Sequence, residues 1–134
     1  MKGGALKGMK VLLVEDVEIN RAIAKRIICG NGGRVVTAYN GREAVSFFLD
    51  SAPGEFAAIL MDLRMPVMDG FAAACQIRAS GREDAGVIPI IAVTSEADEL
   101  NVRRCYDCGM NYHLAKPYEA GSLVGAILKF AKKF

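Results

Sequence analysis

Five short apolar segments recur along the chain, and a stretch with helical spacing follows each of them. The segments are KVLLVED (10–16), GRVVTAY (33–39), FAAILMD (56–62), VIPIIAVTS (87–95) and MNYHLAK (110–116). They are mostly apolar instead of alternating, which is typical of strands buried on both faces of a parallel sheet. Ile19, Ile23 and Ile27 mark the first helical stretch. The pattern predicts an α/β fold, a doubly wound (βα)5 domain with a five-stranded parallel sheet and helices on both faces.

Length and composition indicate one ordinary globular domain. The chain has 134 residues, of which 52% are hydrophobic, and a formal net charge of +2. It can therefore bury a sizeable core without disulfides, and its charge does not favour nucleic acid as a direct partner. No apolar run approaches the roughly 18 residues of a membrane span, so we expect a cytoplasmic protein without a membrane partner. Residues 1–8 are interpreted as a flexible leader outside the fold, and residues 9–134 as the domain.

Four cysteines require an interpretation, because Cys105 and Cys108 form a C-x-x-C motif. A redox motif of this kind needs its nucleophilic thiol at a helix N-terminus, where the helix dipole lowers the thiol pKa. Here the pair lies in the last turn of a predicted helix, where the dipole acts in the opposite sense. A zinc site would need a second pair, and Cys29, Cys75 and His113 stand at unrelated spacings. The thiols are therefore predicted to be structural, behaving as small buried hydrophobes.

Polar residues follow several of the predicted strands at the point where each strand ends. Right-handed crossovers between parallel strands bring these ends to one edge of the sheet, where doubly wound folds bind ligands. Three carboxylates, a hydroxyl and an ammonium meet there: Glu15, Asp16, Asp62, Thr94 and Lys116. Each of these residues alone has an ordinary explanation as a cap, turn or strand end. Their presence together has no such ordinary explanation, because three crowded carboxylates repel one another unless a cation lies among them.

Such a carboxylate cluster is the ligand set of a hard cation. Mg²⁺ takes one or two carboxylates, keeps several waters and completes its shell with phosphate oxygens. A cation beside Thr94 and Lys116 would stabilise a phosphoryl group in transfer, where positioning and charge neutralisation do most of the work. The sequence therefore predicts a site for Mg²⁺, or for Mn²⁺ in its place, that handles phosphoryl groups.

Four segments at these strand ends together resemble the receiver domain of two-component response regulators. They are VLLVEDVEIN (11–20), LMDLRMPVMDG (60–70), IIAVTS (90–95) and LAKPY (114–118), and the similarity covers about residues 9 to 134. The first two are most similar to receiver domains at the end of hybrid histidine kinases. The resemblance implies a flavodoxin-like fold and a phosphoacceptor in a two-component phosphorelay. Such a domain catalyses only its own phosphorylation and dephosphorylation and is not otherwise an enzyme.

The resemblance assigns roles to the residues that match around Asp62. Asp62 would be the phosphoacceptor, whose carboxylate attacks the phosphorus of a phosphohistidine in line with the departing imidazole. Asp16 and Asp62 would bind Mg²⁺ directly, and Glu15 would act largely through a water on the metal. The carbonyl of Arg64 would complete the ligands that the protein supplies.

Further roles concern the switch between the two states. Thr94 would donate its hydroxyl to a phosphoryl oxygen, and Lys116 would pair with another. Pro117, preceded by a cis peptide bond in this family, would shape the turn that aims Lys116. At His113 the chain departs from the family, which usually carries a tyrosine or phenylalanine that rotates on phosphorylation. His113 is therefore either a modified switch residue or a half-exposed edge histidine without a signalling role. At Val17 a polar residue is common in relatives, so the first helix should begin with weaker capping.

The same resemblance implies partners. A histidine kinase or a histidine phosphotransfer protein would donate the phosphoryl group. A downstream protein would bind the surface formed by the helix at about 97–108, the fifth strand and the last helix. The chain would be either a stand-alone receiver or a piece of a larger kinase.

Three other functional interpretations of the sequence compete with a phosphoaccepting receiver. A flavodoxin-like electron carrier needs a phosphate loop after the first strand, and VEDVEINR (14–21) would repel an anionic cofactor there. A haloacid-dehalogenase-like phosphatase needs a second aspartate two residues after Asp62, where this chain has Arg64. A degenerate receiver that acts as a phosphorylation-independent docking module is the stronger rival, although every acidic and basic site position is filled.

Overall fold

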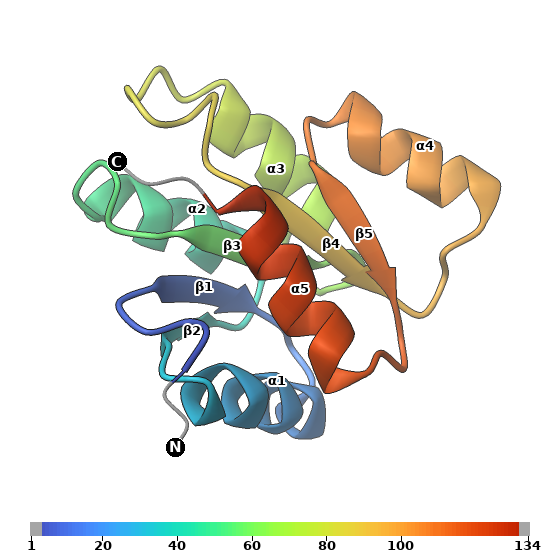
Figure 1. Cartoon of the computed structure of the whole chain (residues 1–134). Coiled ribbons are helices and arrows are strands. Elements are labelled where there is room, and N and C mark those ends of the chain that lie inside the picture. Colours follow the sequence, from blue (N-terminus) through green and yellow to red (C-terminus); the bar gives the residue numbers. More distant parts are fainter. Residues whose placement is uncertain (1–3, 132–134) are drawn as a thin grey trace.

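A five-stranded parallel sheet organises the structure, a computed structural model that describes residues 4–131 (Figure 1). The strands are β1 (Lys10–Val14), β2 (Arg34–Ala38), β3 (Ala58–Asp62), β4 (Ile90–Thr94) and β5 (Tyr112–Ala115). The helices are α1 (Glu18–Gly30), α2 (Gly41–Asp50), α3 (Gly70–Arg78), α4 (Glu99–Asp107) and α5 (Ala120–Phe130). The predicted (βα)5 fold is confirmed. Residues 1–3 and 132–134, at the two ends of the predicted leader and domain, lie outside the described residues.

The strand order places a ligand-binding edge at β1 and β3. The order is β2-β1-β3-β4-β5, and every neighbouring pair is parallel. All residues of β3 and β4 are buried, as their apolar sequences predict. The chain reverses its direction of winding at β1, which lies between β2 and β3. The carboxyl ends of β1 and β3 therefore border the crevice in which doubly wound sheets bind ligands.

Helices cover both faces of the sheet, as predicted (Figure 1). On one face, Ile28 of α1 and Ile127 of α5 belong to one buried apolar cluster. On the other face, Phe48 of α2, Phe71 of α3 and Cys105 of α4 belong to a second cluster. None of the helices within residues 4–131 has both the length and the apolarity that crossing a bilayer requires.

The buried face of α1 differs from the one that its isoleucines mark. Ala24 and Ile28 are the buried residues of this helix, whereas Ile19 is 67% exposed and Ile23 is 49% exposed. Each buried residue follows an isoleucine of the stripe by one position, which is about 100° around the helix axis. The stripe therefore predicted the helix correctly, but Ile19 and Ile23 form an apolar surface that the domain leaves open, whereas Ile27 is half-buried against the core.

The packed structure begins before residue 9. Leu6 is fully buried, and its N–H donates to the carbonyl of Asn31 at 2.9 Å. Its side chain belongs to the same cluster as Ile28 and Ile127. The interpretation of residues 1–8 as a leader outside the fold is therefore wrong for Leu6. The few apolar residues among the glycines and lysines of this segment create no periodicity, so the sequence pattern gives no sign of this packing.

Candidate functional site

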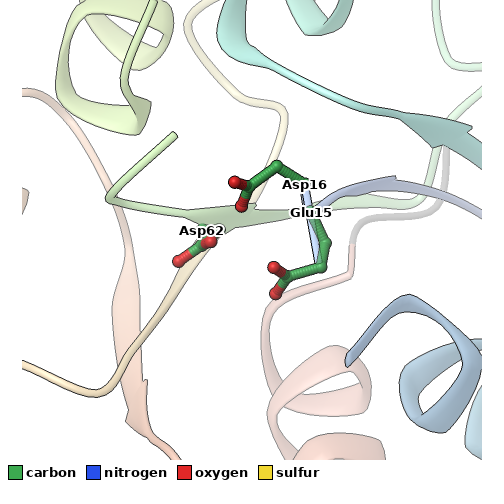
Figure 2. A group of neighbouring side chains, drawn as sticks. All are labelled: Glu15, Asp16 and Asp62. Carbon is green, nitrogen blue, oxygen red and sulfur yellow. The ribbon is translucent and has the colours of Figure 1, made fainter. Parts of the chain in front are cut away.

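Three carboxylates lie together beyond the carboxyl ends of β1 and β3 (Figure 2). Glu15 and Asp16 come directly after β1, and Asp62 is the last residue of β3. One oxygen from each carboxylate lies within 4.8 Å of the other two. Glu15 and Asp62 are buried, with exposures of 4% and 7%. The structure thus brings together the three acidic residues that the sequence placed at one edge of the sheet.

Lys116, the residue after β5, reaches the same cluster. Its Nζ donates to Glu15 Oε1 at 2.8 Å and lies 3.5 Å from Asp62 Oδ1. One ammonium beside three carboxylates leaves the site with an excess of negative charge. The peptide bond between Lys116 and Pro117 is cis, as the family resemblance implied.

Burial raises the pKa of Asp62 to about 7. Desolvation is the largest cause, and the charge of the adjacent Glu15 raises the pKa further, while Lys116 lowers it. A hydrogen bond to Glu15 and the charge of Asp16 add smaller increases. Asp62 therefore loses its proton only near neutral pH, unless added positive charge compensates the negative charge of the neighbouring carboxylates.

The cluster fits a hard divalent cation. Within residues 4–131, Asp16 Oδ1 is the one buried side-chain oxygen or nitrogen that has no hydrogen-bond partner. A buried carboxylate oxygen without a donor is unfavourable, and a cation would satisfy it. All the potential ligand atoms here are carboxylate oxygens, which suit Mg²⁺ or Mn²⁺ and not metals that prefer sulfur or imidazole.

Close backbone contacts fix the turn that follows Asp62. A Cβ atom added to Gly70, the first residue of α3, would come within 2.2 Å of the Asp62 carbonyl oxygen. The side chain of Asp69 caps α3 by accepting a hydrogen bond from the N–H of Ala72 at 2.9 Å. At the tip of the turn, Val67 has a φ of 71°, which β-branched residues rarely adopt. These features hold the end of β3 against the start of α3.

Thr94 and Arg64 lie on the side of the site next to α4. The hydroxyl of Thr94 is buried at the end of β4 and accepts a hydrogen bond from the N–H of Glu96 at 2.9 Å. That bond uses an oxygen lone pair, so the hydroxyl keeps its proton for donation. The Arg64 side chain pairs with Glu96 at 2.8 Å and donates to Asn101 of α4 at 3.2 Å. The roles of the Thr94 hydroxyl and the Arg64 carbonyl toward a phosphoryl group and a metal stay predictions.

His113 lies on the edge strand β5 and faces α4. Its Nδ1 is 3.2 Å from the hydroxyl of Tyr106, and the two rings meet edge to face with centroids 6.0 Å apart. Tyr112 packs with Phe130 of α5 on the other face, as expected from its neighbouring position in the strand. His113 is half-buried, and it forms a polar pair with a residue of α4. Sequence reasoning missed Tyr106, because no local pattern links it to His113.

The cysteines differ from one another in their surroundings. Cys105 is buried near the end of α4, and Cys108 is half-buried directly after this helix, as predicted for the C-x-x-C motif. Cys29 and Cys75 are exposed, so the prediction of buried thiols is wrong for these two. Each follows a buried residue of its helix by one position and therefore points away from the core. Within the described chain, no three cysteine or histidine ligands come together as a metal site.

A hollow beside Lys116 was not foreseen from the sequence. Its volume is about 300 Å³, and it opens between α1 and the loops after β4 and β5. The residues that line it are Asn20, Ile23, Ser95, Lys116, Pro117 and Tyr118. The sequence feature that belongs to this hollow is the isoleucine stripe of α1. Its spacing predicts a buried face, but Ile23 is exposed and lines the hollow.

This fold, with an acidic cluster at β1 and β3 and a lysine after β5, defines a class of signalling domain. The family model described as "Response regulator receiver domain" matches residues 11–128. The chain belongs to this family, which confirms the resemblance found in its sequence motifs.

Relatives of the chain include histidine kinases that are much longer than it is. The chain is 31% identical over 143 residues to Histidine kinase 3 of Arabidopsis thaliana, an alignment that covers 93% of this chain and 14% of the kinase. It is 34% identical over 121 residues to the peroxide stress-activated histidine kinase mak2 of Schizosaccharomyces pombe, covering 89% of this chain and 5% of the kinase. The chain therefore corresponds to a small part of these relatives.

Two solved structures share both fold and sequence similarity with the chain. The receiver domain of a sensor histidine kinase from Pseudomonas aeruginosa, with a magnesium ion coordinated in its active site cleft, is 35% identical. It has a TM-score of 0.83 and covers 92% of this chain and 97% of that chain. The receiver domain of Ssk1, solved with the Saccharomyces cerevisiae histidine phosphotransfer protein Ypd1, is 30% identical, with a TM-score of 0.82. That match covers 95% of this chain and 91% of that chain.

Proposed function

We propose that Asp62 of this receiver domain accepts a phosphoryl group from a phosphohistidine and that a downstream protein reads the modified surface. The observation that carries the proposal is the place of Asp62. It is a buried carboxylate at the carboxyl end of β3, grouped with Glu15 and Asp16 and 3.5 Å from the ammonium of Lys116. Phosphoryl transfer depends on such positioning and charge compensation more than on covalent chemistry by the protein.

The transfer forms one bond and breaks one bond. An oxygen of the ionised Asp62 carboxylate attacks the phosphorus while the bond from phosphorus to the donor imidazole nitrogen breaks. The products are an acyl phosphate on Asp62 and a histidine, whose released nitrogen takes a proton from water. Lys116 would pair with one phosphoryl oxygen, and the Thr94 hydroxyl would donate to another. The domain would catalyse this transfer and the later hydrolysis of its own acyl phosphate, and no other reaction.

Glu15, Asp16 and Asp62 would hold a Mg²⁺ or Mn²⁺ ion, with the Arg64 carbonyl as a further ligand. When bound, the cation neutralises charge on the carboxylates and on the phosphoryl oxygens. Such compensation is needed here, because burial and Glu15 raise the pKa of Asp62 and so disfavour the carboxylate form that attacks. In the P. aeruginosa receiver domain the corresponding cleft contains a magnesium ion.

The donor would bind over α1, next to the site. Val17, Ile19 and Ile23 are exposed apolar residues in and just before this helix, and Ile23 also lines the hollow beside Lys116. An apolar surface that borders a phosphoacceptor site suits a helical histidine phosphotransfer protein, whose histidine must approach Asp62 closely. The complex of Ypd1 with the Ssk1 receiver domain supports this class of partner.

The output would pass through α4, β5 and α5. This surface exposes Leu100 and Tyr106 on α4, and the hydrogen bond between Tyr106 and His113 joins α4 to β5. A response of this surface to phosphorylation is a prediction from the resemblance, and a cytoplasmic location of the protein is a prediction from the short apolar runs of its sequence.

Phosphorylation by a small-molecule donor tests the proposed chemistry. Radiolabelled acetyl phosphate with Mg²⁺ should label the wild-type chain, and Asp62→Asn should abolish the label. The double variant Cys105→Ser, Cys108→Ser is the matched control and should label normally. Labelling of Asp62→Asn at the wild-type rate would show that another residue is the nucleophile. A folded wild-type chain that takes up no label, even from a phosphohistidine protein, would instead favour the phosphorylation-independent docking module.

A further inference from the structure

Cys75 and Cys108 lie together in the structure although they are far apart in the sequence. Cys75 is in α3, Cys108 directly follows α4, and both line one hollow of about 330 Å³. The two segments that carry these thiols are thus neighbours on one face of the molecule. We propose that these two residues are an oxidation site at which an intramolecular disulfide forms. The phosphoacceptor function does not require this site, and the C-x-x-C motif points to a different pair.

A second set of contacts holds the two segments in place. Arg78, one helical turn after Cys75, donates to the carbonyl oxygen of Gly109 through Nε at 2.9 Å and Nη2 at 2.7 Å. Gly109 is the residue next to Cys108, and a Cβ atom there would meet the Arg78 side chain at 2.9 Å. The backbone at Cys108 is therefore tied to the last turn of α3. This proximity matters because a disulfide forms only where the two Cβ atoms can approach within about 3.5–4.5 Å.

Exposure distinguishes this pair from the C-x-x-C pair. Cys75 is exposed, so a dissolved oxidant reaches its sulfur directly. Cys108 is half-buried beside it, in the position of a resolving thiol. Cys105 is 1% exposed and packs within the core cluster of α2 and α3, so an oxidant meets it last. The structure thus selects Cys75 with Cys108 and leaves Cys105 reduced.

A disulfide of low molecular weight, such as oxidised glutathione, balances the reaction. The Cys75 thiolate attacks one sulfur of the oxidant, which forms a mixed disulfide on Cys75 and releases one glutathione thiolate. The Cys108 thiol then gives up its proton to solvent and attacks the Cys75 sulfur, which releases the second glutathione. Two protein thiols are oxidised to one disulfide, and one glutathione disulfide is reduced to two glutathione molecules.

The order of these two steps follows from the surroundings of Cys108. Burial and the neighbouring Cys75 thiol raise the pKa of Cys108 to about 12, so Cys108 carries little thiolate at neutral pH. The charge of Cys75 is a further cause of the increase, and Arg104 opposes it. Once Cys75 is in a mixed disulfide, it can no longer carry a negative charge, and that part of the increase is removed. Cys108 therefore becomes more reactive after Cys75 has reacted.

The bond would join the end of α3 to the end of α4. It closes a loop between two cysteines that are 33 positions apart, which constrains the chain between them. Because this loop includes all of α4, the amides of α4 should exchange with solvent more slowly in the oxidised protein. An effect on signalling through α4 rests on the proposed function, whereas formation of the disulfide does not.

Incubation of the whole chain with oxidised glutathione, followed by mass spectrometry, tests the proposal. A proteolytic digest of the wild-type protein should contain one linked pair of peptides with Cys75 and Cys108, two hydrogen atoms lighter than the sum of the two free peptides. Cys108→Ser should stop at a stable glutathione adduct on Cys75. Cys29→Ser and Cys105→Ser are the matched controls and should form the same bond as the wild type.

Three results would overturn the proposal. They are a linked pair of Cys105 with Cys108 in the wild type, an intramolecular disulfide in Cys75→Ser, and a wild-type protein that keeps glutathione adducts without losing two hydrogen atoms. Circular dichroism of each variant establishes that it is folded before oxidation. Acetyl phosphate labelling of the same variants is independent of these outcomes, so failure of the disulfide and failure of the phosphoacceptor role are distinguishable.

Discussion

Asp62 is buried among negative charges, and both conditions favour its protonated form. Its pKa rises from 3.8 to about 7, chiefly through desolvation and the charge of Glu15. In the unfolded chain these causes are absent. The folded protein therefore binds a proton at Asp62 between about pH 4 and pH 7 that the unfolded chain has already lost.

This difference predicts how stability depends on pH when no metal is present. Because the pKa in the folded state is raised, the contribution of Asp62 to stability is fully present below about pH 4 and is lost as the pH rises through about 7. One pKa unit corresponds to about 1.4 kcal/mol, so the loss amounts to a few kcal/mol. Asp62→Asn removes this loss and should make the protein more stable than the wild type at about pH 8 and flatten the decline. Urea unfolding of both proteins in EDTA at several pH values measures the free energy of unfolding and its decline with pH. Parallel pH profiles for the two proteins would contradict the expectation.

Asp16 supplies the second prediction at this scale. Asp16→Ala should abolish Mg²⁺ binding, because it removes the carboxylate whose Oδ1 has no partner within the described residues. The variant should also be at least as stable as the wild type without metal, since it relieves repulsion with Glu15 and Asp62. Titration with Mg²⁺, followed by amide NMR shifts, measures the binding. Asp50→Ala, which removes an exposed carboxylate on α2, is the control and should bind normally. Full Mg²⁺ affinity in Asp16→Ala would exclude the proposed ligand set.

At the scale of elements, α4 and β5 are joined by the pair of Tyr106 and His113. The backbone N–H of Lys116 donates to the carbonyl oxygen of Thr94 at 2.8 Å, which links the end of β5 to that of β4. A phosphoryl group on Asp62 would draw the Thr94 hydroxyl toward it, because a hydrogen bond requires about 2.7 Å between the oxygens. A movement at Thr94 is therefore passed to β5 through this hydrogen bond. Within β5 it reaches His113, which contacts Tyr106 of α4.

We expect the phosphoryl mimic beryllofluoride, added with Mg²⁺, to shift the ring resonances of His113. The chain contains one histidine, so its NMR signals are identified without ambiguity. Tyr106→Phe keeps the ring but removes the hydroxyl that lies 3.2 Å from Nδ1, and it should reduce the shift. Large amide shifts in α4, β5 and α5 beside an unchanged His113 would show that the signal passes through Thr94 without the histidine.

The elements also show what sequence patterns reveal and what they do not. The strands were predictable because each apolar run is long enough to be recognised by itself, and their order along the chain implied which polar residues share an edge. The open face of α1 was not predictable, since Ile19 and Ile23 have the spacing of a buried stripe. Pairs such as Cys75 with Cys108 depend on how two helices pack, which no local pattern encodes. The same reason hides the contact of Tyr106 with His113.

At the scale of the whole molecule, one edge of the sheet gathers the phosphoacceptor, the lysine and the open face of α1. The hollow of about 300 Å³ connects the lysine with the open face of α1, because Ile23 and Lys116 both line it. Leu128, by contrast, is 43% exposed on α5 and lines hollows that contain none of these residues. A protein donor and a small-molecule donor therefore face different requirements. Both must reach Asp62, but only a protein is large enough to cover α1 at the same time.

This difference predicts a separation between two donors. The double variant Ile19→Ser, Ile23→Ser should slow phosphoryl transfer from a histidine phosphotransfer protein by about tenfold or more, because burying one such side chain contributes about 1.5–3 kcal/mol. Labelling by acetyl phosphate should stay at the wild-type rate, since no ligand of the site is changed. Leu128→Ser removes an exposed apolar side chain of equal size elsewhere and is the matched control for both reactions. Stopped reactions with each donor, separated by electrophoresis, give the rates. Equal slowing with both donors would mean that the variant disturbs the site itself, and normal transfer from the protein donor would mean that the open face of α1 binds something else.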